Sequence, residues 1–218
     1  MRFRDRQAAG LVLVDPVTTL IAESGLEPDR LQVLALPRGG VPVARPIADA
    51  LGVRLRILLV RKVGLPGHPE LAMGAIAALG GRLVEVDNPE VLTAYGIDRQ
   101  TWERVEARER QELQRRTERF AGFLATDPAD APVLLVDDGL ATGATMRAAV
   151  TALRAAGAGP ILAAVPVASR QALEDLTADG ILTVCLTMPD PLIAVGAAYR
   201  DFSQLTDDKV LDLLQSGG

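Results

Sequence analysis

The segment 133–145, Val-Leu-Leu-Val-Asp-Asp-Gly-Leu-Ala-Thr-Gly-Ala-Thr, constrains the fold of this chain more than any other part of it. It begins with four apolar residues, which is typical of a strand buried on both faces of a parallel sheet. Two carboxylates and a turn of small residues follow, and 146–156 then has a helical composition that ends at Gly157. Ligands bind at such strand-to-helix junctions in open α/β sheets. We therefore predict a ligand loop over 137–145.

The chemistry of this loop suits a sugar phosphate. The first N–H groups of the helix, with the hydroxyls of Thr142 and Thr145, form a site for a phosphate monoester. Asp137 and Asp138 are acceptors suited to ribose hydroxyls or to the water shell of Mg²⁺. The alternative is a purely structural turn in which the two carboxylates cap the helix. Adjacent carboxylates after a buried strand do little for stability alone, which favours the ligand site.

The stretch 136–145 resembles the phosphoribosyl pyrophosphate (PRPP) motif of the type I phosphoribosyltransferases, which consists of apolar residues, two acidic residues and a Thr-Gly-x-Thr loop. The resemblance implies transfer of a 5-phosphoribosyl group from PRPP to a nitrogen of a nucleobase or related acceptor, with release of pyrophosphate. It implies a 5′-phosphate site made of Ala141, Thr142, Gly143, Ala144 and Thr145. It also implies catalytic roles for Asp137, Asp138 and Lys62, with Mg²⁺ held by the two aspartates through water.

Two further basic segments resemble the pyrophosphate-binding parts of this family. In Arg38-Gly39-Gly40, after the apolar run 31–36, the glycine pair exposes backbone N–H groups to an anion and the guanidinium adds a fork of donors. Arg61 and Lys62 follow the strand expected over 54–60. By the resemblance, all five residues would bind the leaving pyrophosphate.

Residues 61–71 contain four glycine or proline positions, which predicts a flexible loop. In the family, a mobile loop here closes over PRPP. His68, the one histidine of the chain, is either a proton donor, a pyrophosphate contact or a merely solvated side chain. Glu70 is either solvated or a base for the incoming nucleophile.

The segment 189–203 resembles the part of purine-type enzymes that closes over the nucleobase. We expect Tyr199 and Phe202 to stack on the acceptor and Asp201 or Asp190 to accept a hydrogen bond from a ring N–H; the alternative for the two rings is a core aromatic pair. Hypoxanthine and guanine enzymes carry an aspartate inside the phosphate loop, where this chain has Ala141. That departure leaves the acceptor open.

Strands alternating with helices predict an α/β fold with a doubly wound, mainly parallel sheet. The expected strands are 31–36, 54–60, 133–136, 161–165 and 181–186, and the expected helices are 42–51, 146–156 and 171–178. Residues 71–86 predict two strands joined at Gly80-Gly81. We expect a single domain over 1–218. It should carry a small appendage made of a hairpin and of an inserted helical subdomain at 87–125. A C-terminal hood is expected at 186–218.

A charged helix is expected over 98–123, with a thin apolar stripe at Trp102, Val105, Leu113 and Phe120. We expect it to lie solvated over the edge of the sheet; the alternative is an oligomer contact or a lid.

Composition narrows the function classes. A net charge of −5 argues against a nucleic-acid surface, which needs clustered Lys and Arg. No apolar run approaches the roughly 18 residues of a membrane span, so we expect a cytoplasmic protein without a membrane partner. Its expected ligands are PRPP and a small-molecule acceptor, and a homodimer is the commonest closed assembly. The alternative is a PRPP- or nucleotide-sensing regulator on the same fold.

Overall fold

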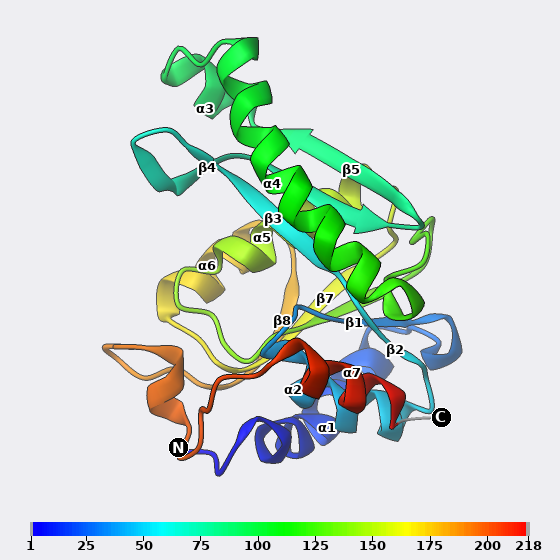
Figure 1. Ribbon diagram of the computed structural model, residues 1–218. Coiled ribbons are helices and arrows are strands. Elements are labelled where there is room, and N and C mark those ends of the chain that lie inside the picture. Colours follow the sequence, from blue (N-terminus) through cyan, green and yellow to red (C-terminus); the bar gives the residue numbers. More distant parts are fainter. Residues whose placement is uncertain (1, 217–218) are drawn as a thin grey trace.

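A computed structural model describes residues 2–216, apart from the side chains of Pro69 and Glu70. Its central sheet is entirely parallel, with strand order β2-β1-β6-β7-β8 (Figure 1). The strands are β1 (Gln32–Ala35), β2 (Leu55–Ile57), β6 (Val133–Val136), β7 (Ile161–Val167) and β8 (Leu182–Thr187). The predicted fold class, α/β with a mainly parallel sheet, is confirmed.

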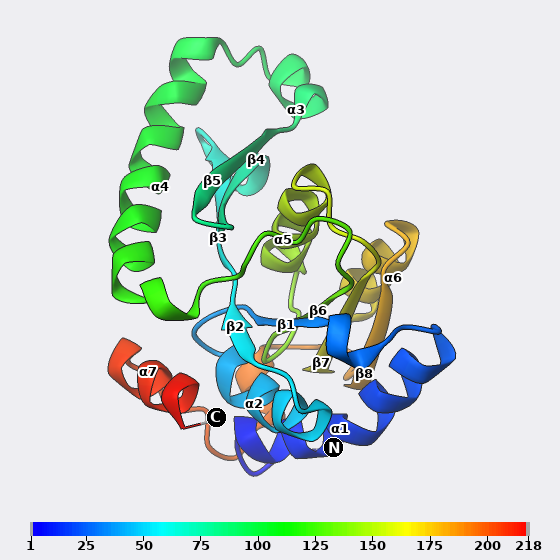
Figure 2. The same cartoon turned by 90° about the vertical axis from the view of Figure 1, so that its right-hand side faces the viewer.

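Helices cover both faces of this sheet, as a doubly wound fold requires (Figure 2). The helices α1 (Arg6–Glu23), α2 (Gly40–Leu51) and α7 (Asp207–Gln215) lie on one side, and α5 (Ala144–Ala155) and α6 (Arg170–Ala178) on the other. Alternate residues of each strand therefore enter different cores. Leu134 and Val136 of β6 pack with the α1 and α2 side, whereas Val133 and Leu135 pack with the α5 and α6 side. This explains why the whole strand is apolar.

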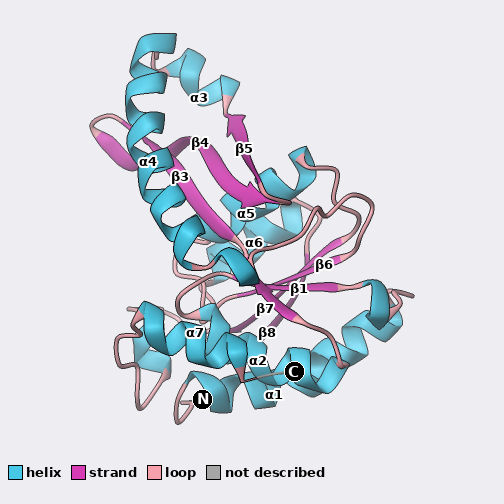
Figure 3. Cartoon of the chain, turned by 45° about the vertical axis from the view of Figure 1, so that its right-hand side comes forward, coloured by secondary structure: helices cyan, strands magenta, loops and turns pink. Residues whose placement is uncertain are grey.

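A second, antiparallel sheet projects from the first and carries two helices of its own (Figure 3). It consists of β3 (Leu59–Leu65), β4 (His68–Leu79) and β5 (Arg82–Asp87), followed by α3 (Pro89–Ala94) and α4 (Arg99–Arg119). We call residues 59–119 the arm. One face of its sheet packs against α4 and the other against α5.

The charged helix α4 is held to the arm by the apolar stripe that the sequence predicts. Trp102, Leu113 and Phe120 are buried with Val63 and other residues of the arm strands. An added Cβ at Gly74 of β4 would lie 2.2 Å from a ring carbon of Trp102, so only glycine permits this contact. The helix thus covers the arm sheet, and not the edge of the central sheet.

Two expectations about residues 54–71 are wrong. The single strand over 54–60 is divided at Leu58: β2 belongs to the central sheet, and β3 begins the arm. The flexible loop over 61–71 is instead a strand pair with a turn at Pro66-Gly67. Val63 and Leu65 provide the reason, because they are buried beneath α4, while an irregularity of the pairing accommodates Gly64.

Helix α1 was not among the predicted elements. The side chain of Asp5 caps it by accepting a hydrogen bond of 2.7 Å from the backbone N–H of Ala8. Leu13, Val17 and Ile21 bury its inner face. Short 3-10 turns occur at Pro28–Arg30, Ala121–Phe123 and Val195–Ala198. Across residues 2–216, none of the helices combines the length and the apolar character needed to cross a bilayer.

Candidate active site

The strand order places the candidate site between β1 and β6. From β1 the chain passes through α2 to β2 on one side, and from β6 it passes through α5 to β7 on the other. The loops after these two neighbouring strands therefore diverge and leave a crevice at their carboxyl ends. The backbone N–H of Leu36 donates a hydrogen bond of 2.9 Å to the carbonyl of Val136, which ties the two loops together.

The glycine pair after β1 is required by the contact between these loops. A Cβ on Gly39 would lie 2.0 Å from Oδ2 of Asp138, and one on Gly40 would lie 2.4 Å from the carbonyl oxygen of Val136. The Arg38-Gly39-Gly40 segment and the carboxylate pair thus share one site, as the sequence predicts. Arg38 remains partly exposed, with its Nη1 3.8 Å from Oδ1 of Asp207 at the start of α7.

The two carboxylates have different environments. Asp137 accepts a hydrogen bond of 2.8 Å from the backbone N–H of Asp138, and Asp138 forms an ion pair of 2.7 Å with Nε of Arg6. Burial, and then the charge of Asp138, raise the pKa of Asp137 well above its ordinary value. Burial also raises the pKa of Asp138, although the hydrogen bond and the charge of Arg6 oppose that rise. Arg6 therefore favours the charged form of Asp138.

The phosphate loop leads directly into the first turn of α5, which starts at Ala144. Gly143 has a φ of +70°, a conformation that favours glycine and turns the chain into the helix. Thr142 and Thr145 are exposed beside the first N–H groups of α5. Ser169 Oγ donates a hydrogen bond of 2.7 Å to the carbonyl of Ala141 and so fixes the loop from behind. The predicted phosphate residues form one open helix N-terminus.

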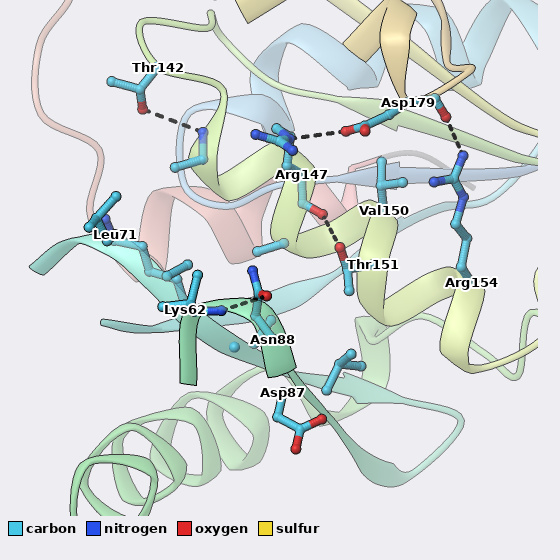
Figure 4. A pocket seen from close by; sticks show the side chains of 17 residues that line it. Lys62, Leu71, Asp87, Asn88, Thr142, Arg147, Val150, Thr151, Arg154 and Asp179 are labelled. Atoms are coloured by element: carbon cyan, nitrogen blue, oxygen red, sulfur yellow. Dashed lines mark hydrogen bonds and ion pairs between the residues drawn. The ribbon is translucent and has the colours of Figure 1, made fainter. Parts of the chain in front are cut away.

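Strand β3 places Arg61 and Lys62 on opposite faces of the arm sheet. Arg61 turns toward α4, where its Nη2 lies 2.7 Å from Oε2 of Glu109. Lys62 turns toward α5 and lines a cavity of about 500 Å³ that also reaches Thr142 and Ala144 (Figure 4). Lys62 therefore lines one cavity with Thr142 and Ala144, whereas Arg61 has its partner on the other face of the arm sheet.

The far wall of this cavity is charged. Arg147 lies 3.0 Å from Oδ2 of Asp179, and Arg154 donates to the backbone carbonyl of the same residue (Figure 4). These contacts attach α5 to the end of α6. Lys62 approaches from the opposite side, near Asn88.

Tyr199 does not provide a stacking surface, and that prediction is wrong. Its side chain is 1% exposed, between the rings of Phe3 and Phe202 at centroid distances of 5.7 Å and 5.0 Å. Its hydroxyl donates a hydrogen bond of 2.6 Å to the backbone carbonyl of Asp138. Tyr199 is thus part of the core together with Phe3, because the hood segment packs against the carboxylate loop instead of standing above it.

The neighbours of Tyr199 are partly open. Phe202 is 36% exposed, with the guanidinium of Arg6 lying 3.7 Å from its ring centroid. Asp201 is exposed and accepts hydrogen bonds from the N–H and the hydroxyl of Ser203. Phe202 thus lies next to Asp138 through the side chain of Arg6.

His68 and Glu70, the two residues predicted to lie in a flexible loop, belong to the start of β4. His68 is exposed at the start of β4, with its ring centroid 6.0 Å from that of Tyr95. The side chain of Glu70 lies outside the described part of the structure.

Arg6 is the residue at the crevice that the sequence did not reveal. It stands 132 positions from Asp138, and no local pattern links the two. The one usable signal was Asp5, a helix-capping residue that places Arg6 at the start of a helix.

A magnesium ion at this site would be held through its water shell and not by a cage of protein ligands. The described residues contain no group of three or more His, Cys, Asp or Glu side chains that could enclose a metal. Asp137 and Asp138 therefore suit an ion that keeps its water shell and takes its remaining ligands from a bound phosphate.

Comparison with known proteins agrees with this geometry. The sequence profile of the phosphoribosyl transferase domain matches residues 16–199, which include every part of the crevice except Arg6 and the end of the hood. The chain belongs to this family. It is 39% identical over 213 residues to a Mycobacterium tuberculosis protein named "Putative phosphoribosyl transferase", covering 97% of this chain. The chain spans about half of that relative, 46% of its length.

A solved structure shows the same architecture over the whole chain. The crystal structure of TT1426 from Thermus thermophilus is 43% identical in sequence and superposes with a TM-score of 0.85. The match covers 100% of this phosphoribosyl transferase chain and 99% of that one. The arm and the hood therefore belong to a shared architecture.

Proposed function

We propose that this chain transfers the 5-phosphoribosyl group of PRPP to a nitrogen of a nucleobase or related acceptor and releases pyrophosphate. The observation that supports this most is the meeting of three chemically distinct groups, carried by two loops, at one crevice. PRPP presents a phosphate monoester, a diol and a diphosphate. The crevice offers an open helix N-terminus, a carboxylate pair and a glycine loop with an arginine, in that order.

Each part of PRPP has a proposed partner. The 5′-phosphate binds the N–H groups and hydroxyls of Ala141, Thr142, Gly143, Ala144 and Thr145. The ribose hydroxyls bind Asp137 and Asp138. The pyrophosphate binds Arg38, the N–H groups of Gly39 and Gly40, and Lys62. Arg61 joins them by leaving Glu109, which costs little because the pair is partly exposed.

The chemistry follows from charge and position. The bond between C1 of the ribose and the pyrophosphate oxygen breaks, and its electron pair leaves with pyrophosphate. The acceptor nitrogen supplies the electron pair of the new bond to C1, and its proton passes to solvent water. Positive charge grows on the ribose as the bonds exchange, and the adjacent carboxylates stabilise it, while Arg38 and Lys62 stabilise the departing anion. A bound Mg²⁺ would neutralise charge on the diphosphate.

The acceptor contacts are proposed to come from the segment after Tyr199. Asp201 supplies an acceptor for a ring N–H, and Phe202 supplies apolar surface. Both belong to the hood segment, which reaches the crevice through Arg6.

A calorimetric titration of PRPP with Mg²⁺ tests the donor site. We expect micromolar binding by the natural chain and none by the Asp137→Asn/Asp138→Asn variant. Asp29→Asn, which removes an exposed carboxylate away from the crevice, should bind normally. A screen of nucleobases for pyrophosphate release then tests transfer.

The outcomes separate the candidate functions. Binding followed by release with one base supports the transferase. Binding without release for every base favours the sensing regulator. Absence of binding by the natural chain would contradict both.

A further inference from the structure

The guanidinium of Arg6 contacts both the carboxylate loop and the hood segment. Its Nε donates to Oδ2 of Asp138 at 2.7 Å, and its Nη1 donates to the carbonyl of Ser203 at 3.0 Å. Its guanidinium also covers Phe202, with the central carbon 3.7 Å from the ring centroid. The side chain is 12% exposed, so these contacts are largely shielded from water.

A second set of contacts, through Tyr199, also joins the carboxylate loop to the hood segment. Phe202 stacks on Tyr199, and the hydroxyl of Tyr199 returns to the backbone carbonyl of Asp138. Asp138, Arg6, Phe202 and Tyr199 therefore form a closed circuit of contacts.

This arrangement leaves Asp138 able to bind a ligand. A carboxylate offers about four acceptor positions on its two oxygens. Arg6 occupies one of them on Oδ2, which leaves Oδ1 for a hydroxyl. A carboxylate held in one orientation binds a diol without first losing rotational freedom.

We propose that Arg6 is a positioning residue that couples the donor site to the acceptor segment 199–203: it orients Asp138 for the ribose and places Phe202 beside the acceptor. The inference rests on the proposed function, because it takes the ribose as the ligand of Asp138. Its consequence is that a change at Phe202, which does not belong to the donor site, alters the affinity for PRPP.

The test is a set of PRPP titrations in the presence of Mg²⁺. Phe202→Leu should weaken PRPP binding about five-fold, within the range measured for coupled neighbours. In the Arg6→Gln background, the same change at Phe202 should have no further effect. Arg6→Lys separates charge from coupling: it keeps a cation for Asp138 but cannot also cover Phe202 with a planar group. It should weaken PRPP binding about five-fold, as Phe202→Leu does in the natural chain, and be insensitive to a further Phe202→Leu change.

Phe3→Leu is the matched control. Phe3 packs on Tyr199 as Phe202 does, but it is the ring of Phe202 that lies beneath the guanidinium of Arg6. Phe3→Leu should leave PRPP affinity unchanged, and the melting temperature of every variant shows that each is folded at the temperature of titration.

Three results would overturn the coupling while leaving the proposed function intact: no effect of Phe202→Leu in the natural chain, an equal effect of Phe3→Leu, or a persistent effect of Phe202→Leu without Arg6. A natural chain that binds no PRPP would overturn the proposed function as well.

Discussion

The hydroxyl of Tyr199 donates a hydrogen bond of 2.6 Å to the backbone carbonyl of Asp138, so an aromatic residue of the hood supports the carboxylate loop from within the core. The contact joins residues that lie 61 positions apart. It means that the hood and the PRPP motif form one packed unit. The first prediction follows from this bond.

Tyr199→Phe keeps the ring and removes the bond. We expect the free energy of unfolding to fall by about 1–2 kcal/mol, because a buried carbonyl loses its partner. Denaturant unfolding measures the change. Tyr95→Phe is the control, since Tyr95 is 49% exposed and should tolerate the loss of its hydroxyl. Equal stability of Tyr199→Phe and the natural chain would show that the bond contributes nothing.

Asp137→Asn should stabilise the protein in a pH-dependent manner. The pKa of Asp137 is raised in the folded state, chiefly by burial, so its ionisation opposes folding. This loss of unfolding free energy is absent at pH values below about 3.9, the pKa of an aspartate in the unfolded chain. It reaches its full size at pH values above the pKa of Asp137 in the folded state. The variant should therefore unfold at higher denaturant concentration than the natural chain at about pH 8, and the advantage should shrink as the pH falls towards 4.

Denaturant unfolding across that pH range measures this difference, with Asp29→Asn as the control for loss of one charge. A stability difference that stays constant over the range would contradict the assigned pKa direction.

Gly39→Ala should separate the two loops of the crevice. The new Cβ would meet Oδ2 of Asp138 at 2.0 Å, which forces that carboxylate or the Arg38 loop to move. We expect a loss of about 1–3 kcal/mol in unfolding free energy and at least a ten-fold weaker affinity for PRPP. Gly122→Ala, where a Cβ meets nothing within 4 Å, should change neither quantity. A Gly39→Ala variant with unchanged affinity would exclude this contact from the ligand site.

Lys62 and Arg61 should differ in their effects although they are adjacent in sequence. Lys62→Met should weaken the binding of inorganic pyrophosphate about ten-fold, because Lys62 lines the cavity beside the phosphate loop. Arg61→Met should have a smaller effect and cost less than about 1 kcal/mol of stability, as expected for its partly exposed pair with Glu109. Calorimetric titration of pyrophosphate compares the two. The reverse order would indicate that Arg61 contributes more than Lys62 to binding the anion.

Local sequence patterns were sufficient to predict the central sheet and the turn that leads into α5. The four apolar residues of β6 and the small residues before α5 are contiguous, so short-range preferences define both the strand and the turn that follows. The hairpin at Gly80-Gly81 was predictable for the same reason, and it is confirmed between β4 and β5.

The errors concern residues whose neighbours are distant in sequence. The segment 61–71 has the composition of a loop, yet Val63 and Leu65 become strand residues because α4 covers them. Tyr199 has the chemistry of a stacking residue, but Phe3 and Phe202 enclose its ring.

The sequence by itself determined the family motif, the parallel sheet and the identity of the phosphate, carboxylate and glycine segments, because each depends on residues that are adjacent along the chain. Only the tertiary structure decided that Arg6 pairs with Asp138, and that Lys62 but not Arg61 faces the phosphate loop. These relationships arise from the packing of α1 and α4 against strands formed elsewhere. Long-range packing leaves no periodic signal in the residues that it brings together.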